Sequence, residues 1–115
     1  MRDDPLTVVM NSGKSADICI LSLQGPLTLS NLFDFQKALA DTTARVTIFD
    51  LADSAYIDST GLGALLKFYV SAKRRGGLVQ LVGVNYRIAE MLALTKADTL
   101  MKSYPTIEAA ERDIA

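Results

Sequence analysis

The sequence contains no histidine and only one cysteine, and these two absences exclude several classes of protein. Without histidine, the chain cannot build a His-based catalytic triad or a His-ligated metal site. With Cys19 alone it cannot form an internal disulfide, which fits a reducing cytoplasm. Because Cys19 lies in an apolar run at residues 18–21, we expect a small packing residue rather than a reactive thiol.

Long hydrophobic runs and an excess of one charge are also missing. No apolar run reaches membrane-spanning length and no signal-peptide pattern is present, so we expect a cytoplasmic protein that does not insert directly into a membrane. The formal net charge is −1, and the only concentrated basic stretch is residues 73–75. Such a short stretch is too small for a nucleic-acid footprint, so we expect no nucleic-acid partner.

What the sequence does contain is the composition of a compact globule. Half of its 115 residues are apolar and 22% are charged. A chain of this length can bury a core without disulfides or metals, and we expect residues 1–115 to form one domain.

The hydrophobic pattern predicts an α/β fold in which strands and helices alternate. Strands are predicted at residues 6–10, 17–23, 45–51, 78–82 and 99–104. Helices are predicted at residues 32–40, 62–75 and 86–94, with a last one starting at Pro105. The first two strands form a hairpin, and the later alternation favours parallel strands. We therefore expect a four- to five-stranded mixed, mainly parallel sheet with an N-terminal hairpin and about four helices.

Local signals mark where these helices begin and end. Ser30 or Asn31 can cap the first helix, and Asn85 can cap the third. Pro105 suits the first position of the last helix. Gly76, preceded by basic residues, is a typical stop for the second helix.

The most informative stretch is Asp58-Ser59-Thr60-Gly61-Leu62-Gly63, between a predicted buried strand and a predicted helix. Unpaired backbone N–H groups and the positive end of the helix dipole collect at such a point. The two adjacent hydroxyl groups can cap the helix, bind a phosphate, or be presented to an incoming enzyme. The two glycines let the turn bend and let the helix approach the sheet.

A nucleotide site is poorly supported by this stretch. The spacing lacks the Lys-Ser or Lys-Thr of a P-loop, and Asp58 places negative charge where a phosphate would bind. We expect no cofactor, no catalytic residue and no metal. Asp50 is expected to accept backbone hydrogen bonds after its strand, and Asp53 to be solvated.

The helix after the turn has a wide apolar arc. Leu62, Leu65 and Ala72 cluster on one side, whereas Phe68 falls on a flank. Either neighbouring helices cover that flank, or Phe68 belongs to a partner-binding patch beside Ser59.

The residues 48–51 (Ile-Phe-Asp-Leu) and 56–63 (Tyr-Ile-Asp-Ser-Thr-Gly-Leu-Gly) resemble the signature of the STAS domain. More particularly, they resemble that of the bacterial anti-sigma factor antagonists. The resemblance extends to the Leu-rich helix ending at Gly76, the strand at residues 78–83 and the helix at residues 85–94.

This resemblance implies a binding switch rather than an enzyme. Family members bind an anti-sigma factor, typically a serine kinase, that phosphorylates the serine after the aspartate, and a cognate serine phosphatase reverses the reaction. The phosphorylated residue would be Ser59, with Thr60 less favoured. The implied partner-binding residues are Tyr56, Asp58, Ser59, Thr60, Gly61, Leu62, Gly63, Lys67 and Phe68.

The chain departs from the family pattern after its second predicted strand. Members commonly carry Gly-Glu-Leu-Asp there, whereas this chain has Gly25-Pro26-Leu27-Thr28 and lacks both carboxylates. An alternative reading is therefore an unphosphorylated STAS subunit that braces a membrane-associated lipid-transport ATPase complex.

Overall fold

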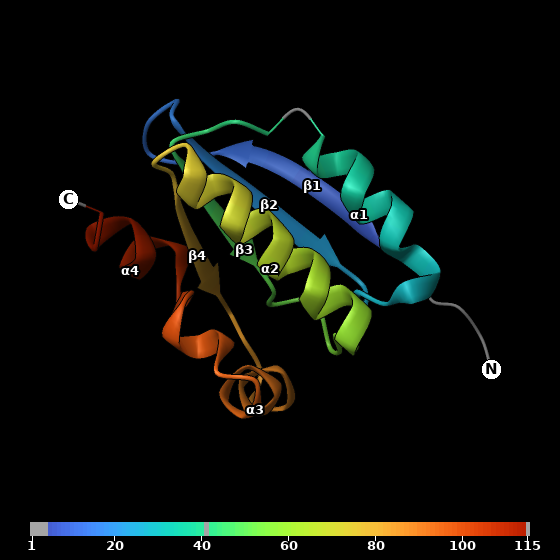
Figure 1. The fold of residues 1–115 in the computed structure, drawn as a ribbon. Coiled ribbons are helices and arrows are strands. Elements are labelled where there is room, and N and C mark those ends of the chain that lie inside the picture. The colour runs from blue at the N-terminus through green and yellow to red at the C-terminus, as the bar shows by residue number, and fades with distance from the viewer. Residues whose placement is uncertain (1–4, 41, 115) are drawn as a thin grey trace.

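The computed structural model describes residues 5–40 and 42–114, which build one mixed five-stranded sheet flanked by helices (Figure 1). The strands are β1 (Thr7–Ser12), β2 (Ile18–Gln24), β3 (Val46–Asp50), β4 (Leu78–Val82) and β5 (Lys102–Tyr104). They lie side by side in chain order. β1 pairs with β2 antiparallel, and every later pair is parallel. The predicted fold class and its N-terminal hairpin are confirmed.

Helices cover both faces of the sheet. The helical elements are η1 (Leu29–Asn31), α1 (Leu32–Leu39), α2 (Ser59–Arg74), α3 (Tyr86–Leu94), η2 (Ala97–Thr99) and α4 (Ile107–Arg112). α1 and α2 lie along one face (Figure 1), while α4 packs on the other. Among the described residues, none of the helices has the length and apolar content needed to cross a bilayer.

The core is divided by the sheet into two clusters. The larger one lies under α1 and α2 and contains Phe35 and Phe49, whose ring centroids are 5.9 Å apart. The smaller one lies under α4 and contains Ile48, Val82 and Ala110. β3 therefore contributes to both clusters, which explains why its sequence shows no polar alternation.

The helix ends match the local signals only in part. Asn85 caps α3 as predicted, because its Oδ1 accepts from the Ile88 N–H at 2.9 Å. Asn31 precedes α1, but its Oδ1 accepts from the Thr28 N–H at 2.8 Å and closes the short turn η1. The prediction that α4 starts at Pro105 is wrong: Thr106 is its cap, accepting from the Ala109 N–H at 3.1 Å.

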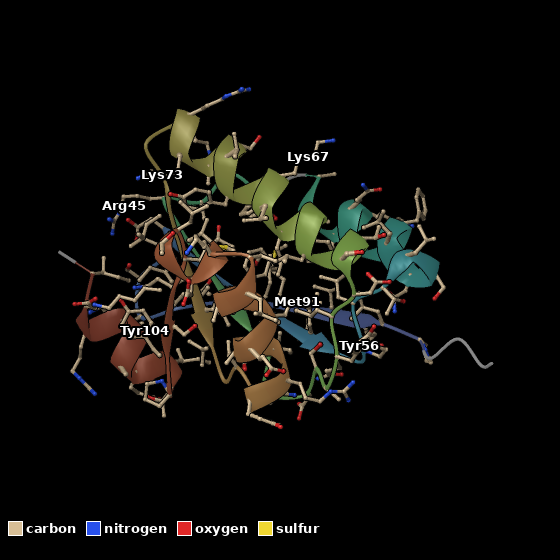
Figure 2. The ribbon with its side chains drawn as sticks, turned by 60° about the horizontal axis from the view of Figure 1, so that its bottom comes forward. Arg45, Tyr56, Lys67, Lys73, Met91 and Tyr104 are labelled. Carbon is tan, nitrogen blue, oxygen red and sulfur yellow. The ribbon has the colours of Figure 1, made fainter. Side chains whose placement is uncertain are left out.

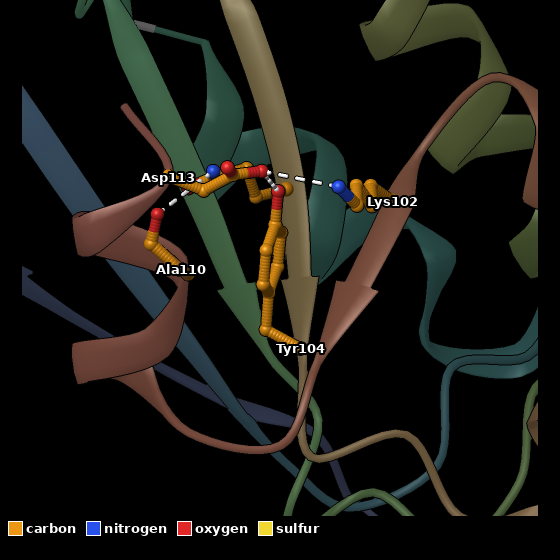
Figure 3. A network of polar contacts seen from close by, with 5 residues as sticks. Lys102, Tyr104, Ala110 and Asp113 are labelled. Atoms are coloured by element: carbon orange, nitrogen blue, oxygen red, sulfur yellow. Dashed lines mark hydrogen bonds and ion pairs between the residues drawn. The ribbon is translucent and has the colours of Figure 1, made fainter. Parts of the chain in front are cut away.

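A polar network fastens α4 to the edge of the sheet (Figure 3). The Asp113 carboxylate accepts from the Tyr104 hydroxyl and from the Lys102 ammonium at 3.2 Å. These two donors hold the pKa of Asp113 below its ordinary value of 3.8. A buried amide adds to the docking, because Gln80 Nε2 donates to the Ala110 carbonyl at 3.0 Å.

Candidate functional site

The start of α2 is capped by Asp58, the residue before the two hydroxyls. Asp58 Oδ1 accepts from the Gly61 N–H at 2.8 Å, the usual N-cap bond. Its Oδ2 accepts from the Leu29 N–H at 3.0 Å, so the same carboxylate joins α2 to η1. Capping, one of the three roles open to the hydroxyls, is therefore performed by Asp58.

Ser59 is the first residue of α2, and its side chain is exposed. Ser59 Oγ makes no hydrogen bond with any residue in the described part of the chain. Thr60 is half-buried. The Ser59 hydroxyl is thus accessible to a second molecule and is not needed to hold the helix.

The two glycines of the turn differ in their surroundings. A Cβ at Gly61 would lie 2.3 Å from the Leu27 carbonyl oxygen, so only glycine lets α2 approach this loop. A Cβ at Gly63 would meet no heavy atom within 4 Å, and this residue is exposed. A close approach is therefore found at Gly61, toward the loop at Leu27 rather than toward the sheet, and the expectation is wrong for Gly63.

Three residues expected at the partner surface lie in the interior instead: Gly61, Leu62 and Phe68. Phe68 is 8% exposed, and its ring meets Phe49 edge-on at 5.4 Å between centroids. The Arg75 guanidinium covers another side at 5.6 Å. Of the two alternatives for this flank, coverage by a neighbouring helix is confirmed, because α1 packs beside α2, and the placement of Phe68 in an exposed patch is wrong.

Tyr56 and Lys67 flank the turn on different sides (Figure 2). Lys67 is exposed on α2. Tyr56 is 41% exposed, and the Arg87 guanidinium of α3 lies 5.1 Å from its ring centroid. Tyr56 also borders a groove of about 390 Å³ that α3 lines with Met91 and Leu94.

The structure adds two apolar side chains that sequence reasoning missed. Leu29 of η1 is 68% exposed and Phe33 of α1 is 73% exposed. The bond from the Leu29 N–H to Asp58 places η1 against the start of α2, and Phe33 follows one helical turn later. A usable signal was present, because Phe33 falls outside the face formed by Leu32, Phe35 and Leu39.

The remaining polar candidates have structural surroundings. Asp50 Oδ1 accepts from the Ala52 N–H at 3.0 Å, as expected, and Asp53 is exposed. Within residues 5–40 and 42–114, no three of the Cys, Asp and Glu side chains gather where they could hold a metal ion. Cys19 is half-buried against the larger core cluster, and this burial raises the pKa of its thiol.

The fold and this site define an α/β domain that presents a serine hydroxyl at the start of a helix. Residues 10–110 match the family model described as STAS domain. The chain therefore belongs to the STAS domain family.

Its relatives agree with this assignment. A Thermotoga maritima protein named "Putative anti-sigma factor antagonist" is 29% identical over 102 residues, which cover 85% of this chain and 90% of the relative. A crystal structure carrying the same name and organism is 27% identical, with a TM-score of 0.86 and 93% of each chain covered.

The Bacillus protein SpoIIAA shares the fold at lower identity. It is 14% identical, and its unphosphorylated form has a TM-score of 0.74 over 92% of this chain and 95% of that one. Its phosphorylated form has a TM-score of 0.72 over 92% and 98%. At this identity the likeness establishes the fold alone.

Proposed function

We propose that this chain is an anti-sigma factor antagonist that binds a serine-kinase-type anti-sigma factor, and that phosphorylation of Ser59 releases it. The observation that carries the proposal is an accessible Ser59 hydroxyl beside a cap already supplied by Asp58. The relatives named as anti-sigma factor antagonists support the class of partner. A cognate serine phosphatase would restore binding, and the cycle would run in the cytoplasm without catalysis by this chain.

The surface offered to the partner combines polar and apolar groups around the turn. Ser59, Thr60 and Gly63 form its centre at the start of α2. Its rim is made of side chains exposed on neighbouring elements: Leu29, Phe33, Tyr56 and Lys67. Residues 25–33, which include Leu29 and Phe33, contain no charged side chain. We therefore expect the partner to contact this part of the surface with apolar rather than basic groups.

Phosphorylation would act through local charge. A phosphate adds about −1.5 to −2 charge at neutral pH, next to the carboxylate of Asp58. At a docked interface, such a charge without a partner costs on the order of 2–5 kcal/mol. This corresponds to a loss of affinity by a factor of tens to thousands.

The test is calorimetric titration of the serine-kinase-type anti-sigma factor encoded in the same genome with matched variants. Ser59→Ala should bind like the wild type, whereas Ser59→Asp should lose affinity by a factor of tens or more. Ser71→Asp is the control, because Ser71 is an exposed serine farther along α2 and receives the same charge. Equal affinities for Ser59→Asp and Ser71→Asp would contradict the proposal.

A second measurement identifies the modified residue. After incubation with the kinase and ATP, mass spectrometry of the peptide around residues 58–67 should place one phosphate on Ser59 and none in Ser59→Ala. Capture of an ABC-type ATPase by the unmodified chain, with no phosphate acquired, would favour the membrane-associated alternative instead.

A further inference from the structure

The two edge strands of the sheet, β5 and β1, differ in how well they are protected against pairing with a strand of another molecule. β5 is three residues long, carries Lys102 and is fastened to α4 through Asp113. β1 is six residues long, Thr-Val-Val-Met-Asn-Ser, with no charge, no proline and an unbroken register with β2. No strand in the described part of the chain pairs with its other edge. Natural sheets normally guard such an edge with lysine, proline or a bulge.

The direction of the backbone groups along β1 follows from its pairing. The Gly13 N–H donates to the Ile18 carbonyl at 2.8 Å, and hydrogen-bonded pairs alternate along an antiparallel ladder. Thr7, Val9 and Asn11 therefore exchange their bonds with β2. The N–H and C=O groups of Val8 and Met10 point away from β2, toward the open edge.

The side chains at this edge are suited to a contact between identical molecules. Met10 is 54% exposed although it is apolar. An antiparallel pairing of β1 with its own copy is closed by a two-fold axis, and it opposes no like charges because the strand has none. The side of α1 above β1 carries Asp34 and Lys37, which line a groove with Leu6, Thr7 and Val8. This side of α1 therefore carries one charge of each sign and adds no net charge next to the edge.

We propose that β1 is a dimerisation edge, where two copies of this chain pair their β1 strands antiparallel into one continuous sheet. The contact leaves α2 and the Ser59 turn free, since these elements lie away from this edge of the sheet. The proposal is independent of the phosphorylation switch. A dimer would present two Ser59 surfaces at once.

Sedimentation equilibrium of the full chain, combined with matched lysine variants, tests this edge. The wild type should show a dimer whose fraction rises with concentration, and Met10→Lys should weaken dimerisation at least tenfold. Leu94→Lys is the control: it also places a lysine at an exposed apolar position, but on α3. A wild type that stays monomeric at millimolar concentration overturns the proposal, as does equal dimerisation of the two variants.

Amide hydrogen exchange gives a second test that requires no substitution. The Val8 and Met10 amides should exchange rapidly in dilute protein and become protected as the concentration rises. The Thr7 and Val9 amides, bonded to β2 in each copy, should be protected throughout. Unchanged exchange at Val8 and Met10 across that range would show that this edge stays open, and the proposal would be wrong.

Discussion

Replacing each glycine of the α2 turn by alanine separates folding from binding. At Gly63 the added Cβ has no neighbour within 4 Å, so the change removes only the backbone entropy cost of glycine in a helix. That cost is about 0.5–1 kcal/mol. We therefore expect Gly63→Ala to stabilise the fold and to raise Tm by roughly 2–4 °C for a chain of this size.

At Gly61 the same substitution should destabilise. The added Cβ would lie 2.3 Å from the Leu27 carbonyl oxygen. Leu27 cannot retreat easily, because its oxygen accepts from the Asp58 N–H at 3.1 Å and its side chain is fully buried. Overpacking of this kind costs about 1–3 kcal/mol, which outweighs the helix-propensity gain. We expect Tm to fall by roughly 4–12 °C.

The effect of Gly63→Ala on partner binding should be opposite to its effect on stability. The new methyl group of Gly63→Ala lies one helical turn after Ser59, on the surface proposed for the partner. Affinity for the anti-sigma factor should fall about tenfold although the fold is more stable. Thermal unfolding by circular dichroism and calorimetric titration measure the two effects separately. If Gly63→Ala lowers Tm, the surroundings of Gly63 are not open as described. If it raises Tm but leaves the affinity unchanged, Gly63 is not part of the partner surface.

Two further substitutions test the core and the α4 network. Phe68→Ser should lower the free energy of unfolding, measured by urea titration, by about 3–5 kcal/mol, because the ring is buried against Phe49. A loss below 1 kcal/mol would contradict the burial of Phe68 in the core. The hydrogen bonds from Tyr104 and Lys102 lower the pKa of Asp113. The contribution of Asp113 to the free energy of unfolding is therefore present above about pH 4, and it is lost as the pH falls through this lowered pKa. Asp113→Asn should therefore reduce the drop in stability below pH 4, and an unchanged pH profile would contradict this role.

The fold was predictable because its signals are local. The apolar run of β3, the stop at Gly76 and the cap at Asn85 each depend on a few neighbouring residues. The burial of Phe68 does not depend on such local signals. Its angle on α2 placed it on a flank, and only the packing of α1 beside α2 determines that this flank is buried.

The candidate site was predictable in its centre but not in its rim. Ser59 and Asp58 are adjacent in sequence, and their motif identified them. Leu29 reaches the same place through its bond to Asp58, 29 residues away in sequence. A contact at that separation depends on how β2, β3 and the loops after them lie in space, which the hydrophobic pattern does not specify.

The carboxylate of Asp58 also determines how a phosphate on Ser59 would be received. A helix start is usually a favourable place for an anion, because its free N–H groups can donate to it. Here Asp58 already accepts from the N–H groups of Gly61 and Leu29. A phosphate on Ser59 would add its charge outside this cap, beside the Asp58 carboxylate. Its main effect would therefore fall on a docked partner, which would have to supply the compensating charge or dissociate.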